Sequence, residues 1–212
     1  MANINAPSGL VPVQYLQGNA WNGMGRIYTI DSGDTNAYAP GDPVATATTK
    51  ADAYGISAVT LATAGTGHAL RGVAIAFGTG VAGSTATGGG QSGGGPYINP
   101  SDLTKIIVPA TKATNWYALV VDDPSVIFEI QEIGTGTVLT KTIIGQNANL
   151  VSGTNNGYVS GWMLDNSGAG TGATLQLRIL GLVQRSDVVF GQYNKWLVKL
   201  NNHEFSAGVL GV

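Results

Sequence analysis

The sequence predicts an all-β protein, a β-sandwich or barrel of jelly-roll type with an extended N-terminal arm and a Gly-rich loop. Three observations lead to this prediction. The periodicity of amphipathic helices is nearly absent from the 212 residues. Short runs rich in β-branched residues alternate apolar and polar side chains, and clusters of Gly, Pro, Asn and Asp separate them. The length allows one large β domain or two small ones.

The first segment, residues 1–20, is predicted to be an extended arm rather than a core strand. Pro7 and Pro12 interrupt it, and it carries Gly9 and Gly18. Such an arm can pair with the sheet edge of a neighbouring molecule through main-chain hydrogen bonds. We therefore expect its apolar residues and the adjacent aromatic to form a partner interface: Leu10, Val11, Val13, Tyr15, Leu16 and Trp21.

Three further regions follow along the chain. Residues 21–77 form a first β-rich part, residues 78–96 form a flexible loop with nine glycines, and residues 97–212 form a second β-rich part packed with the first. Alternating apolar runs predict strands at several places: 26–30, 43–48, 57–63, 70–77, 105–109, 116–121 and 158–164.

The three clearest strands lie in the second part. Residues 174–184 alternate regularly, and Gly181 interrupts the pattern in a way that indicates a bulge. Residues 126–133 place Val126, Phe128 and Ile130 inward, with Glu129 and Gln131 outward. Residues 195–200 alternate inward-facing Trp196, Val198 and Leu200 with two outward lysines.

Two glycine motifs match catalytic or nucleotide-binding patterns by chance. Residues 78–83 match G-x-G-x-x-G, but no helix follows to hold a pyrophosphate. Residues 90–94 match G-x-S-x-G, but no strand-to-helix turn surrounds Ser92. We therefore expect no catalytic and no cofactor-binding residues, and no cofactor.

The ionisable residues also favour structural roles. Asp122 and Asp123 precede Pro124, as in a turn, although carboxylate pairs also occur in glycosidases. Glu132 falls on the inward register, and we expect it to form an ion pair with Arg178 or Arg185.

His68 and His203 lack the spacing of a metal site, so no metal is expected, and both are predicted to be surface or interface groups. Trp116, Trp162 and Trp196 lie in alternating strands, which favours core packing over a sugar-stacking platform.

The composition excludes several classes of protein. The net charge is −2, which excludes a strongly basic nucleic-acid binder, and the chain has no Cys for disulfides or thiol catalysis. Charged residues make up 10% of the chain, against about 25% in an average domain. A surface with so few charges favours an assembled protein. We find neither a membrane span nor a secretory signal.

Several segments of the second half resemble the head proteins that decorate or cement the capsid of tailed bacteriophages. These segments are WYALVVDDPSVIFEIQE, QNANLVSGTNNG, SGWMLD and LQLRILGLVQRSDVVFGQYNKWLVKLNNH, within residues 116–203. The opening MANINAPSGLVPVQYL and the segment LATAGTGHALRGVAIAF are also similar, less specifically. The resemblance implies a β-rich virion protein that binds the outer capsid, often as a trimer, and it brings no catalytic residues.

The sequence thus predicts a non-enzymatic capsid decoration (cement) protein whose partner is the major capsid protein. We expect a homo-oligomer, a homotrimer by the resemblance, made in the host cytoplasm and located on the outer capsid surface of the virion. The alternatives are a phage tail or fibre component that binds host glycans, and a carbohydrate-binding module or hydrolase.

Overall fold

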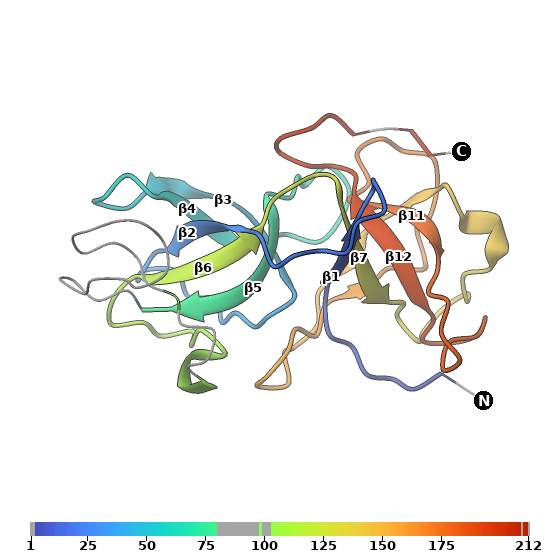
Figure 1. The fold of residues 1–212 in the computed structure, drawn as a ribbon, viewed down its shortest axis with the longest axis horizontal. Coiled ribbons are helices and arrows are strands. Elements are labelled where there is room, and N and C mark those ends of the chain that lie inside the picture. Colours follow the sequence, from blue (N-terminus) through green and yellow to red (C-terminus); the bar gives the residue numbers. More distant parts are fainter. Residues whose placement is uncertain (1–2, 80–97, 99–102, 209, 212) are drawn as a thin grey trace.

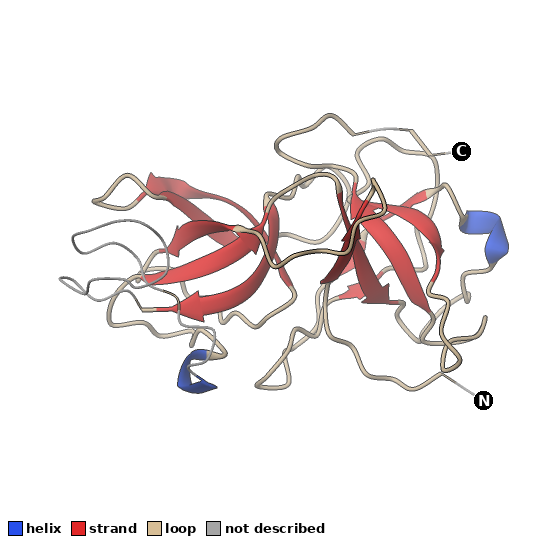
Figure 2. Cartoon of the chain, viewed as in Figure 1, coloured by secondary structure: helices blue, strands red, loops and turns tan. Residues whose placement is uncertain are grey.

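Strands and loops make up nearly all of the computed structural model, which describes residues 3–79, 98, 103–208 and 210–211. Its helical elements are two single 3-10 turns, Leu103–Lys105 and Lys141–Ile143 (Figure 2). The predicted all-β class is therefore confirmed.

Five strands close into a barrel, which we call the barrel lobe (Figure 1). They follow the order β2-β4-β3-β5-β6 around the barrel, and β2 runs parallel to β4. The strands are β2 (Arg26–Ile30), β3 (Asp42–Ala51), β4 (Ser57–Leu61), β5 (Gly72–Gly78) and β6 (Trp116–Val121).

A second, open sheet of five strands forms the sheet lobe, with the order β1-β7-β12-β11-β8. The two lobes lie end to end in Figure 1. The sheet-lobe strands are β1 (Val11–Tyr15), β7 (Val126–Gln131), β8 (Asn147–Ala148), β11 (Leu177–Leu182) and β12 (Lys195–Leu200). Two short strands, β9 (Leu150–Val151) and β10 (Met163–Leu164), pair separately.

The boundary between the lobes differs from the division predicted at residues 78–96. After residues 78–96 the chain returns to the barrel and forms β6. This strand pairs with both β2 and β5 and so closes the barrel. The chain enters the sheet lobe through residues 122–125 instead. The N-terminal strand β1 also belongs to the sheet lobe.

Two clusters of buried apolar side chains form the core. The smaller one fills the barrel: Tyr28, Ile30, Tyr38, Val44, Val59, Ala74, Phe77, Val108, Ala118 and Val120. The larger one fills the sheet lobe and includes Trp162, Trp196 and Phe128. Four of its members come from the barrel segment of the chain: Ala62, Leu70, Val73 and Val121. The larger core therefore reaches across the boundary between the lobes.

The alternating patterns of β7, β11 and β12 are largely as predicted. Trp196, Val198 and Leu200 are buried, and the pairing of β11 with β12 shifts register between Ile179 and Gly181, where a bulge was expected. Gln131 is an exception, because it was expected to face outward and is buried. The N-terminal segment covers it, with the Ala6 N–H donating to its Oε1 (2.8 Å).

Two predicted strands are mostly absent. In 105–109, Val108 makes a single bridge to Tyr38 and no ladder. In 158–164, pairing is confined to Met163–Leu164, because the preceding residues form a turn in which Asn156 Oδ1 accepts the Val159 N–H (2.9 Å). Side chains that bond to nearby backbone compete with sheet pairing.

Candidate functional site

The N-terminal segment, predicted to be a free arm, is a strand of this chain's own sheet. β1 pairs antiparallel with β7, with Val11 opposite Glu129 and Tyr15 opposite Val126. Leu10 is fully buried in the larger core. Pro12 is tolerated because β1 lies at the edge of the sheet, where one side of the strand needs no ladder hydrogen bonds.

The outer edge of β1 is also largely covered, which argues against pairing with a neighbour's sheet there. The chain turns back at residues 16–19, so that Gln14 bridges to Ala20. The Trp21 N–H donates to the Val13 carbonyl (3.1 Å), and the Tyr15 N–H donates to Asn19 (2.8 Å). We call this turn-back, residues 11–24, the N-terminal hairpin.

The six predicted interface residues separate into three groups in the structure. Leu10, Tyr15 and Trp21 pack against the larger core, and the Trp21 Nε1 donates to the Met24 carbonyl (3.2 Å). Val13 is half-buried. Val11 and Leu16 are exposed, at 38% and 48%. Met24, which sequence reasoning missed, is the most exposed apolar residue of the hairpin at 68%.

The lobes meet at a tight backbone crossing. The Leu10 N–H donates to the Gly41 carbonyl (3.0 Å), and the Ser160 N–H donates to the Pro40 carbonyl (2.9 Å). Gly9 has a φ of +65°, and a Cβ there would lie 2.3 Å from the Gly41 carbonyl oxygen. Only glycine fits such an approach and adopts this φ without strain.

A buried glutamine makes a second contact between the lobes. The Gln176 Nε2 donates to the carbonyls of Thr63 (2.8 Å) and His68 (3.1 Å). Its Oε1 accepts the N–H groups of Gly65 (3.0 Å) and Leu150 (3.1 Å). All four bonds satisfy buried or half-buried backbone, so Gln176 fixes the β4–β5 loop of the barrel segment against the sheet lobe.

A third contact is made by the segment after β12, residues 201–206, which we call the C-terminal latch. The Leu70 N–H donates to the Asn202 carbonyl, and the Glu204 N–H donates back to the Leu70 carbonyl, both at 2.9 Å. These two bonds pair the latch with the chain just before β5. The latch therefore holds the sheet lobe against the barrel through the backbone.

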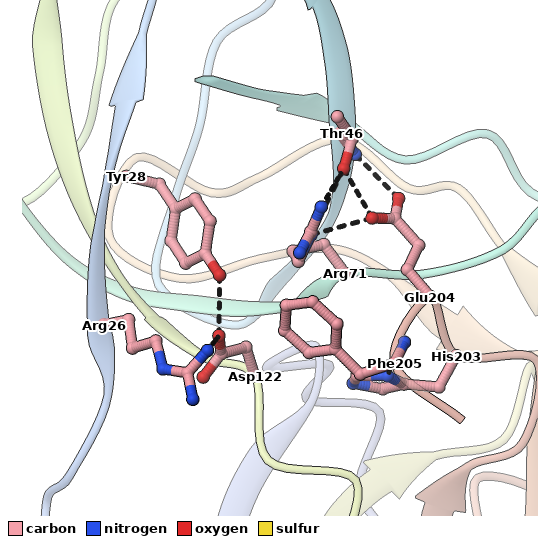
Figure 3. Close-up of polar contacts among 8 residues, drawn as sticks. All are labelled: Arg26, Tyr28, Thr46, Arg71, Asp122, His203, Glu204 and Phe205. Carbon is pink, nitrogen blue, oxygen red and sulfur yellow. Dashed lines mark hydrogen bonds and ion pairs between the residues drawn. The ribbon is translucent and has the colours of Figure 1, made fainter. Parts of the chain in front are cut away.

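Side chains reinforce the latch around Arg71 (Figure 3). The Arg71 Nε lies 2.7 Å from the Glu204 Oε2, and its Nη2 donates to the Thr46 hydroxyl (2.5 Å). Glu204 also accepts the Thr46 N–H (2.8 Å). The guanidinium carbon stands 4.3 Å from the centre of the Phe205 ring, a cation–π distance.

Asp122 lies beside this cluster and connects it to β2. It is buried and accepts the Tyr28 hydroxyl (2.6 Å), while the Arg26 Nη1 lies 3.4 Å from the same oxygen. Burial and the neighbouring Asp122 carboxylate raise the pKa of Tyr28 to about 12. The expected turn is confirmed, because the Ser125 N–H and hydroxyl both donate to Asp123 Oδ1 (2.8 and 2.7 Å).

His203 occupies the centre of the latch and is 3% exposed. Its Nδ1 accepts the Phe205 N–H at 2.9 Å. Its Nε2 is buried and meets no hydrogen-bond partner among the described residues. Burial lowers the pKa of this imidazole, against the opposing effect of nearby carboxylates. The other histidine, His68, is exposed in a turn.

The expected ion pair of Glu132 with Arg178 or Arg185 is wrong. Glu132 is buried, and its partners are uncharged: Trp196 Nε1 donates to Oε2 (2.9 Å), and the Leu139 N–H donates to Oε1 (2.9 Å). Arg185 pairs with Glu129 instead, at 2.7 Å. Trp196 lies on β12, which pairs with β7 but follows it by more than 60 residues, so no local sequence signal indicated this contact.

The barrel has a polar centre of its own that the sequence did not indicate. The Tyr38 hydroxyl donates to Asp34 Oδ2 (2.5 Å) and accepts the Leu61 N–H (3.0 Å). The buried Lys112 ammonium donates to the carbonyls of Asp34 and Asn36. Burial lowers the pKa of Lys112 and raises that of Tyr38. These groups bind backbone and one another, which indicates a structural role.

The two glycine motifs lie almost wholly outside the described residues; Gly78 ends β5. Within the described chain, no group of three or more His, Asp or Glu residues is placed to hold a metal ion. Its helical turns are also too short to cross a membrane.

Comparison with known proteins gives no relative: no family model, no curated protein and no solved structure matches this chain. The resemblance of the segments within residues 116–203 to phage decoration proteins therefore stays a prediction.

Proposed function

We propose that this chain is a non-enzymatic structural protein that binds and stabilises the outer surface of a tailed-phage capsid. Its partner would be the major capsid protein, and a ligand that binds only the assembled shell stabilises that shell by mass action. The N-terminal hairpin, with its exposed Val11, Leu16 and Met24, is the contact surface that we assign to this partner.

The resemblance supports the proposal because its segments include every strand of the sheet lobe. The segments within residues 116–203 contain the strands β7 to β12, and the similar opening segment contributes β1 at the edge of the same sheet. The barrel strands β5 and β6, which pair with each other, also lie in resembling segments.

The exposed side chains of the hairpin carry the proposal further. Leu16 and Met24 lie in a hairpin whose own polar groups are largely satisfied internally, including the Tyr15 hydroxyl, which donates to Asn22 Oδ1 (2.9 Å). The backbone of a hydrogen-bonded hairpin is already ordered, so only side-chain freedom is lost when its apolar residues bind a partner. With only 22 charged residues in the chain, such surfaces favour assembly over an isolated monomer.

The proposal is tested by adding the protein to capsids that lack it and measuring co-sedimentation. We expect the double variant Leu16→Asp/Met24→Asp to lose at least tenfold in capsid affinity while its circular dichroism stays unchanged. Tyr54→Asp, an exposed position at the far end of the β3–β4 hairpin in the barrel, serves as the matched control. Equal occupancy by all three proteins would remove the hairpin from the interface, and binding to tails instead of heads would favour the tail-component alternative.

Self-association is a separate part of the proposal. The resemblance implies a trimer, and closed symmetry is the usual arrangement of identical subunits. Trp21 is a poor anchor for testing it, because its ring packs against the chain's own core. Sedimentation velocity of the unmodified protein at tens of micromolar is the direct measurement, and a monomer there would contradict the trimer.

A further inference from the structure

We propose that the C-terminal latch is an acid-sensitive contact, in which protonation of His203 releases residues 201–206 from the barrel lobe. This inference does not depend on the proposed function. It concerns how the two lobes are held together, and it rests on the position and hydrogen bonding of one buried side chain (Figure 3).

The position of His203 links its charge state to the latch. The two backbone bonds between the latch and Leu70 involve Asn202 and Glu204, the residues on either side of His203. Next in the chain, Phe205 stacks under Arg71, and its N–H is held by the imidazole. Movement of this ring therefore disturbs the contacts that join the latch to the barrel.

The hydrogen bonds leave no place for a second proton on the ring. Because Nδ1 accepts the Phe205 N–H, the neutral imidazole carries its proton on Nε2. A second proton has to bind Nδ1, where it would face the Phe205 N–H, which is also a donor. The imidazolium therefore cannot keep the present geometry, and it would place a charge on a buried ring.

The charged groups around the ring act in both directions. The carboxylates of Asp122 and Asp123 after β6, and of Glu204 in the latch, favour the imidazolium, whereas Arg71 before β5 opposes it. The guanidinium carbon of Arg26 on β2 lies 5.6 Å from the centre of the Phe205 ring. Burial outweighs the carboxylates, so the pKa of His203 lies below its ordinary value.

The sign of the pH effect follows from this lowered pKa. A released latch exposes the imidazole, which then titrates near its ordinary value of about 6.5. Below that pH the released form binds a proton that the closed form does not. The contribution of His203 to closure is therefore complete above about pH 6.5 and is lost as the pH falls toward the pKa of the closed form.

Amide hydrogen exchange between pH 7 and pH 5 tests the inference. We expect the protection factors of the Leu70 and Glu204 amides to fall with decreasing pH, by up to about tenfold per pH unit for one bound proton. The Val198 amide in β12 should keep its protection. In His203→Asn, whose Oδ1 can still accept the Phe205 N–H, the Leu70 and Glu204 amides should show no pH dependence.

His68→Asn is the matched control, because His68 is the only other histidine in the chain and is exposed. This variant should behave as the unmodified protein does. The same pH dependence in the unmodified protein and in His203→Asn would overturn the inference, and so would an equal loss of protection at Val198.

A second measurement keeps the test independent of how well the variant folds. In the unmodified protein, the imidazole signals of the two histidines can be followed by NMR as the pH is lowered. We expect the midpoint of His203 to lie below the ordinary histidine value of about 6.5. A midpoint at or above that value would overturn the inference.

Discussion

The barrel lobe and the sheet lobe are built from the chain in different ways. The barrel uses one continuous stretch, from β2 to β6. The sheet lobe joins β1 to strands that begin more than a hundred residues later, because β7 pairs with β1 on one side and with β12 on the other. A strand recruited across such a distance brings a larger loop-closure cost than a neighbouring one.

The two cores also differ in how much of the chain contributes to each. The barrel core draws its members from the barrel segment alone, whereas the sheet-lobe core includes Leu70, Val73 and Val121 from that segment. The barrel therefore has a core made only of its own residues, whereas the core of the sheet lobe is shared with side chains of the barrel segment. We expect the sheet lobe to depend on the barrel more than the barrel depends on the sheet lobe.

The largest effect should come from removing the central side chain of the sheet lobe. Trp196→Ala deletes a fully buried ring and the indole N–H that serves Glu132, and we expect a loss of about 4 kcal/mol in the free energy of unfolding. Phe77→Ala is the matched change in the barrel core. Urea titration followed by fluorescence measures both.

Hydrogen exchange on the Trp196→Ala variant decides whether the two lobes differ in their stability against local unfolding. Amides of β7 and β12 should lose protection while those of β5 and β6 keep most of theirs. An equal loss in all four strands would break the comparison and make the protein one cooperative unit.

A smaller effect is expected from the N-terminal segment. Leu10→Ala should cost about 3 kcal/mol, because Leu10 is fully buried where the first segment crosses the barrel. Leu16→Ala, six residues further on and exposed, should change stability by less than about 0.5 kcal/mol. Thermal unfolding of the two variants gives the difference, and similar melting temperatures would mean that the segment is not part of the folded sheet lobe.

The smallest effect is expected at the polar centre of the barrel. Tyr38→Phe removes a hydroxyl that donates to Asp34 and accepts the Leu61 N–H, leaving that donor unpaired, at a cost of about 2 kcal/mol. Tyr54→Phe, at an exposed ring, should be neutral. Chemical denaturation measures the free energy of unfolding of both variants. If neither variant changes it, water replaces the lost hydrogen bond, and the barrel is less tightly closed than its contacts indicate.

Local patterns were sufficient for most of the strands and insufficient for their partners. The alternation in residues 195–200 predicted β12 and its buried face, because period-2 alternation reflects one buried side. β1 was missed, since Pro12 and the neighbouring glycines resemble a loop until the strand is placed at an edge. Only tertiary pairing decides that placement.

In the candidate sites, too, local sequence patterns predicted local contacts but not tertiary partners. The turn at Asp123 could be predicted because its hydrogen bonds are local. The partners of Glu132 and the burial of His203 could not, because each depends on residues brought together from distant strands. The alternation around Glu132 shows that its side chain faces inward. It does not show that the partner is the indole of Trp196, because that residue lies far along the chain.

The distance along the chain between β1 and β7 has a consequence for biosynthesis. At ribosomal rates, roughly ten seconds pass between the synthesis of the first strand and of the strand with which it pairs. During that interval Leu10 and its neighbours have no sheet to join, and the barrel is also incomplete, because its closing strand β6 ends at Val121, just before β7 begins at Val126. The nascent chain therefore carries an unpaired first strand until β7 has been made, and this interval is when a chaperone or a second nascent copy could capture it.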